Sequence, residues 1–123
     1  MTSEQYVKAY LAQDAFIVNK FLVQTLGLTE TVLLSLLLDR YTYFSQTNQT
    51  DNGWVYCTGE SLQKTLNLGR RPLDAALKNL EAAQLIETKR KGLPAKKYFR
   101  LSFDNIKNLM AEDNQVCTES TNL

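Results

Sequence analysis

Apolar side chains recur at helical spacing along the N-terminal third of the chain, which predicts a series of helices. A short amphipathic helix is expected over 4–15. Its apolar residues are Tyr6, Val7, Tyr10 and Leu11. Asn19 is placed to cap a second helix that ends at Gly27, because Asn accepts hydrogen bonds from free helical N–H groups and Gly adopts left-handed backbone. Thr29 is placed to cap a third helix that runs to about Phe44.

The third of these helices is apolar around almost its whole circumference. Its apolar residues are Val32, Leu33, Leu34, Leu36, Leu37, Leu38, Tyr41, Tyr43 and Phe44. Packing on one core needs an apolar stripe only somewhat wider than about 100°. Two interpretations therefore stay open: the helix is central in a monomer core, or it pairs with a second copy in a homodimer. The residues expected at such a dimer interface are Leu33, Leu37, Tyr41 and Phe44.

The next part of the chain reads as a strand followed by a helix. A polar loop over 45–53 ends in turn residues and leads into a short strand over 54–57. Thr58 is placed to cap a helix, because its side-chain oxygen can accept from the first free N–H groups. The buried face of this helix is expected to contain Leu62 and Leu66.

A Gly-containing turn over 67–70 leads to a second helix, which runs to about Ala83 and has Pro72 in its first turn. Proline is tolerated there because its missing N–H has no helical partner, and it biases Arg71 away from helical geometry. The residues expected to face the core are Leu73, Ala76, Leu77 and Leu80. Those expected on the exposed face are Asp74, Ala75, Lys78 and Ala82.

Strict alternation of side chains predicts two strands, 85–90 and 96–101, joined by a tip over 91–95. With the strand over 54–57 they complete a small three-stranded sheet. The order strand, helix, turn, helix and hairpin is that of a winged helix-turn-helix. The predicted fold class is therefore mostly α with a small antiparallel sheet (α+β).

One domain is expected over 1–110, in which 4–46 forms additional N-terminal helices and 53–101 forms the helix-turn-helix and its wing. A C-terminal helix over 102–110, capped by its first residue, completes the domain. The inward residues of this helix are expected to be Phe103, Ile106, Leu109 and Met110. The polar and acidic tail over 111–123 is expected to be disordered.

Charge is segregated along the chain, although the net charge is only +1. The segment 64–100 contains ten basic and three acidic residues, a net of +7, whereas the remaining residues sum to −6. A basic segment that coincides with a helix-turn-helix attracts phosphate and predicts double-stranded DNA as the partner. The residues expected to contact DNA are Lys64, Arg70, Arg71, Asp74, Lys78, Lys89, Arg90, Lys91, Lys96 and Lys97.

These residues divide into base-reading and phosphate-binding groups. Arg70 and Arg71 lie near the start of the recognition helix, where an Arg fork matches the O6 and N7 acceptors of guanine. Lys78 lies two turns further along and is better placed for a phosphate. Asp74 shares the exposed face and either accepts from cytosine N4 or orients an arginine. The five wing cations suit backbone phosphates or an adjacent minor groove.

Other classes of function have little support in the composition. Histidine is absent, no phosphate-binding glycine loop is present and the carboxylates are scattered, so we expect no enzyme activity, metal, cofactor or small-molecule substrate. Cys57 and Cys117 lack C-x-x-C spacing and read as reduced thiols. With no visible secretory signal and no apolar run long enough for a membrane, the expected location is cytoplasmic.

Several segments together resemble a known group of proteins. They are Gly53-Trp54-Val55-Tyr56, Thr65-Leu66-Asn67-Leu68, Leu80-Glu81 and the hairpin over 85–99. The group comprises the N-terminal winged-helix domains of replication initiators and replisome organisers from phages and plasmids of Gram-positive bacteria, similar to the DnaD N-terminal domain. The resemblance implies origin or single-strand-junction DNA binding, self-association through the N-terminal elements, and recruitment of other replication proteins.

Two other functions stay open beside this one. A transcriptional regulator of similar fold would bind duplex DNA through the same residues. A protein-interaction module would use the winged helix for oligomerisation and the basic wing for an acidic partner, since fold alone does not determine function.

Overall fold

The computed structural model describes residues 1–48, 52–94 and 96–121, and the side chains of the chain up to residue 112. Three helices form the N-terminal part: α1 (Ser3–Leu11), α2 (Lys20–Leu26) and α3 (Leu28–Gln46). The rest comprises β1 (Val55–Tyr56), α4 (Gly59–Leu66), α5 (Arg70–Ala82), β2 (Ile86–Lys91), β3 (Lys96–Leu101) and α6 (Phe103–Thr121). The expected loop residues 49–51, the tip residue 95 and the tail residues 122–123 lie outside the described part.

The boundary between α2 and α3 follows from two residues. The Asn19 side chain accepts a hydrogen bond from the Leu22 N–H at 3.0 Å, which caps α2 as predicted. Gly27 ends α2 with a φ of +107° and is also the residue that precedes α3. Because α3 begins directly at Leu28, the prediction of Thr29 as its cap was wrong, and Thr29 lies inside the first turn.

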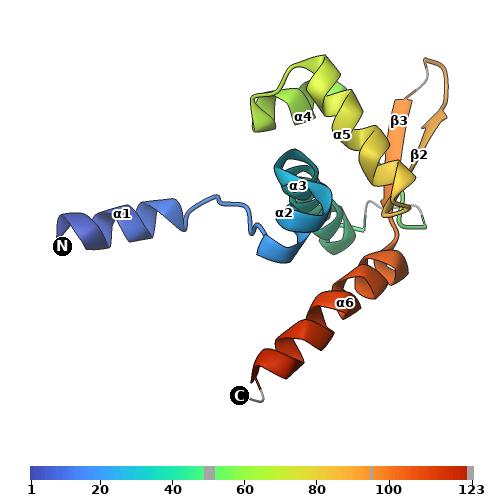
Figure 1. Cartoon of the computed structure of the whole chain (residues 1–123). Helices are drawn as coiled ribbons and strands as arrows, with labels where there is room; N and C mark the ends of the chain where they lie inside the picture. The colour runs from blue at the N-terminus through green and yellow to red at the C-terminus, as the bar shows by residue number, and fades with distance from the viewer. Residues whose placement is uncertain (49–51, 95, 122–123) are drawn as a thin grey trace.

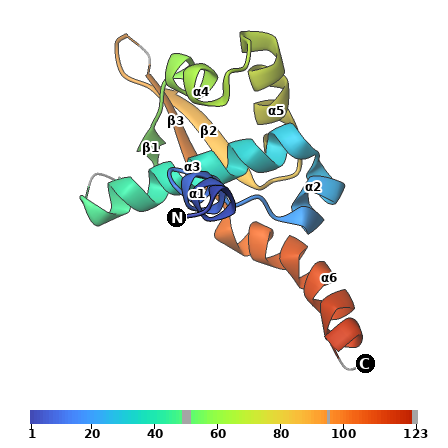
Figure 2. The ribbon, with the colours of Figure 1, turned by 90° about the vertical axis from the view of Figure 1, so that its left-hand side faces the viewer.

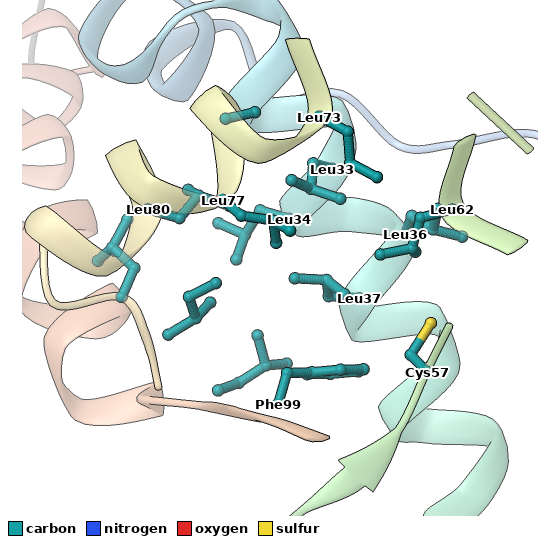
Figure 3. Packing of buried hydrophobic residues seen from close by; sticks show 14 of the residues in the cluster. Leu33, Leu34, Leu36, Leu37, Cys57, Leu62, Leu73, Leu77, Leu80 and Phe99 are labelled. Carbon is teal, nitrogen blue, oxygen red and sulfur yellow. The ribbon is translucent and has the colours of Figure 1, made fainter. Parts of the chain in front are cut away.

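Helix α3 is the centre of the hydrophobic core (Figure 3). Leu33 and Leu37 are 0% exposed, because α2, α5 and the sheet surround the helix within a single chain. The side chains of Leu33 and Leu37 are therefore not available to a second copy, and their assignment to a dimer interface is corrected. The all-round apolar pattern reflects a central position in the monomer, the first of the two interpretations.

The sheet is antiparallel with strand order β1-β3-β2, and β2 and β3 form the hairpin (Figures 1 and 2). The core face of the sheet contributes Val55, Phe99 and Leu101, and α5 contributes the four apolar residues predicted to face inward. The order of elements and the sheet topology confirm the predicted α+β winged-helix class. Within this fold, α5 occupies the place of the recognition helix and the β2–β3 hairpin that of the wing.

Local sequence accounts for the helix-turn-helix. The Thr58 hydroxyl accepts from the Ser61 N–H at 3.1 Å, which caps α4 as predicted. Asn67 ends α4 in left-handed backbone with a φ of +53°. Pro72 lies in the first turn of α5, as expected. Arg71 is helical there, contrary to the expected bias, because α5 begins two residues before the proline.

The two ends of the chain depart most from expectation. Helix α1 runs from Ser3 to Leu11, so it begins one residue before the predicted range 4–15 and ends before that range does; it contributes no buried residue and extends away from the body (Figure 1). Helix α6 continues to Thr121, past the expected end at 110, because no Gly or Pro interrupts the sequence after Met110. The expectation of a disordered tail over 111–121 is therefore corrected. None of the described helices combines the length and hydropathy needed to cross a bilayer.

Candidate nucleic-acid interface

Helix α5 presents one exposed stripe opposite its core face. Arg71, Ala75, Lys78 and Ala82 recur at spacings of three and four residues, so they lie along one side of the helix. All four are exposed, whereas the apolar side of the same helix is buried. Ala75 separates the two cations, and Ala82 continues the stripe beyond Lys78. The small alanine side chains let the helix backbone approach a partner closely.

Arg70 lies on the flank of this stripe rather than within it. Its Nε is 3.7 Å from the Asp74 carboxylate, one turn along α5. Both side chains are at least half exposed, so solvent screens the pair and its contribution to stability is small, about 0–1 kcal/mol. Of the two roles predicted for Asp74, the structure favours orienting an arginine. Arg71 makes no comparable pair with any residue that the structure describes.

The wing cations lie on two different sides of the hairpin, because strand side chains alternate. In the register of the hairpin, Arg90 pairs with Lys97 and Lys91 pairs with Lys96. Arg90 and Lys97 lie on the side that faces α5. Lys89, Lys91 and Lys96 lie on the opposite side, away from the helices. The five cations predicted as one cluster are thus divided between two surfaces.

The inner pair borders a cleft between the hairpin, α4 and the start of α5. This cleft has a volume of about 480 Å³. Its polar lining residues include Glu60, Gln63, Arg70, Asp74, Thr88, Arg90 and Lys97. The first turn of α5 and the wing tip lie at the same end of the molecule, as both Figure 1 and Figure 2 show. The structure therefore brings Arg70 together with the inner wing cations and leaves the outer ones apart.

The outer side of the sheet combines aromatic and basic residues. The Lys89 Nζ lies 4.2 Å and the Arg100 guanidinium carbon 4.7 Å from the centroid of the Trp54 ring. Lys96 lies over the Tyr56 ring at 5.4 Å, and the Tyr56 and Tyr98 rings are 5.6 Å apart. Sequence analysis did not assign this surface, although the alternation of aromatic and basic residues along β3 was its visible signal.

One cation of α3 holds the helix-turn-helix in place and was also not predicted. The Arg40 guanidinium donates to the Ser61 hydroxyl at 2.7 Å and to the Cys57 sulfur at 3.6 Å. These bonds join the central helix to α4 and to the residue that follows β1. Lys64 is exposed in the last turn of α4, close in sequence to the turn before the recognition helix.

The predicted dimer residues that remain near the surface are Tyr41 and Phe44, which are half-buried and pack against the core. Tyr41 contacts Phe103 of α6 edge to face, with ring centroids 5.1 Å apart. Phe103 and Met110 are exposed instead of facing the core as expected, because α6 leaves the body and lines an open groove. Ile106 and Leu109 do pack against the core.

This groove lies between α6, α3 and the segment before α2, and its volume is about 650 Å³. Its apolar lining residues are Ala15, Ile17, Leu22, Leu34, Leu38, Leu101, Phe103, Ile106 and Met110. Helix α1 has its own exposed apolar stripe, composed of Tyr6, Val7, Tyr10 and Leu11. Among the described residues, no group of three or more His, Cys, Asp or Glu side chains is arranged to hold a metal ion.

No family model matches this chain, and no curated protein matches it significantly. Solved structures do share its fold. A chain described as "N-Terminal domain of DNA binding protein" and one described as "Structure of Rep-DNA complex" each have a TM-score of 0.61 at 20% identity, covering 94% of this chain and 95% of theirs. One described as "Structure of MDR initiator" has a TM-score of 0.58 at 19% identity, covering 92% of this chain and 97% of its own. At this level of identity, the likeness shows that the chain shares the fold of these structures along nearly its whole length.

Proposed function

We propose that this chain is a winged-helix protein that binds duplex DNA during replication initiation. Helix α5 enters the major groove with its exposed stripe, and the inner side of the wing contacts the adjoining backbone. The observation that carries the proposal is the joint placement of Arg71 and Lys78 on one helix face with Arg70, Arg90 and Lys97 beside it. A helix of this shape and charge suits the major groove.

Some of these residues would give sequence specificity and others would give affinity for any DNA. Arg71 is exposed near the start of α5, where a guanidinium fork reaches base edges. Lys78 and the inner wing cations bind phosphates, which fixes the register of the helix without reading sequence. Lys64 lies near the same end of the helix-turn-helix and adds a further backbone contact. Asp74 holds Arg70 along the flank of the helix.

Support for a role in replication comes from the structural neighbours, since one is described as a Rep–DNA complex and another as an initiator. The resemblance to initiators and replisome organisers of phages and plasmids points the same way. On this proposal the protein acts in the cytoplasm, on duplex DNA at an origin, and contacts other replication proteins there.

The proposal includes a homodimer, although not through the core leucines first considered. The apolar stripe of α1 has no packing partner within the described chain, and the groove beside α6 is an open apolar surface. Monomeric proteins seldom expose two such surfaces. In the dimer, α1 of each copy lies in the groove of the other, which covers both surfaces at once. Helix α6, which lines the groove, extends from the end of the molecule opposite the wing tip, so the proposed DNA-binding side stays free (Figures 1 and 2).

The experiment that tests DNA binding is fluorescence anisotropy with a labelled random duplex between about 50 and 200 mM salt. We expect the logarithm of affinity to fall linearly with the logarithm of salt concentration, by about 0.9 for each phosphate contact. Binding that is absent at the lowest salt, or unaffected by salt, would contradict the proposal.

The variant Arg71→Ala tests whether Arg71 reads a base or contacts the DNA backbone. On a selected site, Arg71→Ala is expected to cost about 1–3 kcal/mol and to relax specificity, because the guanine contact is lost. The matched control is Lys20→Ala, a change of one exposed cation at the start of α2, which packs against α3. An equal loss on every sequence would assign Arg71 to a phosphate instead.

A further inference from the structure

The outer face of the sheet is a second surface with its own chemistry, separate from α5. The register places Tyr56 beside Tyr98, and Tyr98 beside Lys89 on the other neighbouring strand. Two residues further along β3, Arg100 pairs with Glu87. Trp54, which directly precedes β1, lies two residues before Tyr56 and so on the same side. Rows of aromatic and cationic side chains therefore cross all three strands. No described helix covers this side of the hairpin, since α3 and α5 lie on the other (Figure 1).

The aromatic rings of this face are accessible and the face is strongly basic. Tyr56 is 43% exposed, and Trp54 and Tyr98 are half-buried. Two cations, those of Lys89 and Arg100, lie within 5 Å of the same Trp54 ring centroid. Glu87 is the one carboxylate at an outer position of the described strands, and it is already bound by Arg100 at 2.6 Å. The remaining positive charge attracts an anion to the aromatic surface.

A ligand that satisfies this surface must present flat π-faces and regularly spaced negative charges together. Unpaired nucleotides do so, because each base has a free face for stacking and each linkage has a phosphate. A duplex does not, since its bases are stacked on one another and only their edges are exposed in the grooves. The combination of aromatic platform and cations is the one by which single strands are bound without reading sequence.

We propose that the outer face of the sheet binds single-stranded nucleic acid. Bases stack on Trp54, Tyr56 and Tyr98, and Lys89 and Lys96 move from the rings to the phosphates. This site goes beyond the proposed duplex binding and does not depend on it, because no residue of the α5 stripe takes part. A chain with both surfaces holds a duplex on one side of the hairpin and an unpaired strand on the other.

The test uses the single tryptophan of the full chain as a reporter, because Trp54 lies within the proposed site. A thymidine oligonucleotide of about ten nucleotides is titrated while Trp54 fluorescence is recorded, and an abasic oligonucleotide of equal length supplies the same phosphates without bases. We expect the thymidine strand to quench Trp54 and to bind at least about fivefold more tightly than the abasic strand. Equal affinities, or no quenching, would overturn the proposal. A uridine oligonucleotide in parallel shows whether DNA or RNA is preferred.

Matched variants locate the site. Tyr56→Leu is expected to weaken thymidine binding about fivefold or more, whereas Tyr43→Leu, which changes an exposed tyrosine of α3, should leave it unchanged. Because a strand residue can affect folding, Lys96→Ala supplies a second variant, read by the same titration after thermal unfolding has been checked. Unchanged binding in both variants would overturn the proposal. So would a fall in molecular mass with Tyr56→Leu, which would mark this face as an interface between copies.

The two DNA surfaces can fail independently. Arg71→Ala should weaken duplex binding and leave the thymidine titration unaltered. If the single-strand titration fails while duplex binding holds, the inference is wrong and the proposed function stands. If duplex binding fails while the thymidine oligonucleotide still binds, the proposed function is wrong and the single-strand site stands.

Discussion

Cys57 illustrates how one residue's properties depend on its neighbours. Its side chain is 6% exposed, at the junction of β1, α3 and α4. Burial raises the pKa of the Cys57 thiol above its ordinary value of 9.0, because the thiolate would lose its hydration. The positive charge of Arg40, 3.6 Å away, opposes this shift only in part. The folded protein therefore favours the neutral thiol.

This shift predicts how stability changes with pH. The contribution of the neutral thiol is fully present below the ordinary pKa and is lost as pH rises from that value through the raised pKa of the folded protein, because the unfolded chain ionises first. In a Cys117→Ser background, the Tm should fall more between about pH 7 and pH 10 with Cys57 present than with Cys57→Ala. Parallel Tm curves would show that the thiol does not contribute in this way.

At the scale of single residues, pattern alone could not separate a core leucine from a surface one. Leu37 and Leu38 are adjacent and equally apolar, yet the first is 0% and the second 44% exposed. The difference arises from the packing of α2, α5 and the sheet around α3, which are distant in sequence. The same cause overturned the assignment of Leu33 and Leu37 to an interface.

At the level of helices and strands, the wing shows how much can be predicted from the alternation of side chains along a strand. Alternation predicted both strands, and the pairing of Arg90 with Lys97 follows from their register. The alternation did not predict which side of the hairpin faces α5, because that depends on how the hairpin packs against the helices. The cluster of wing cations inferred from sequence is in fact two groups with different surroundings.

The division of the wing leads to a prediction about duplex binding. Replacing Arg90 and Lys97 together by alanine should lower the salt slope on duplex DNA by about two, because two phosphate contacts are lost. Replacing Lys89 and Lys96 should change this slope much less, although it removes the same charge. Anisotropy titrations of the two double variants at several salt concentrations make the comparison. Equal slopes would mean that the wing binds duplex DNA without regard to side.

At the scale of the whole molecule, the surfaces lie at different ends. The wing tip and the start of α5 lie at one end, and α6, which lines the groove, extends from the other (Figures 1 and 2). The groove and the apolar stripe of α1 come from segments far apart in the sequence. The proposed dimer, built from these two surfaces, would leave the proposed DNA-binding end of each copy exposed.

The dimer can be tested by sedimentation. Tyr10→Asp with Leu11→Asp should convert the dimer to a monomer, because the charges would be buried in the apolar groove. The free energy of unfolding of the monomer should hardly change, since α1 contributes no core residue. Lys8→Ala, on another side of the same helix, is the control. A dimer that survives the double substitution would exclude α1 from the interface.

Local sequence patterns were enough to predict the winged-helix class, the order of its elements and several of their ends. They were enough because caps such as Asn19 and Thr58, and the periodic spacing of apolar residues, act over a few positions. Which neighbour each face of a helix or strand packs against became visible only in the folded chain. The burial of Leu33, the orientation of Arg90 toward α5 and the aromatic face around Trp54 are examples. Those outcomes depend on contacts between distant segments, and local pattern does not encode which surfaces come together.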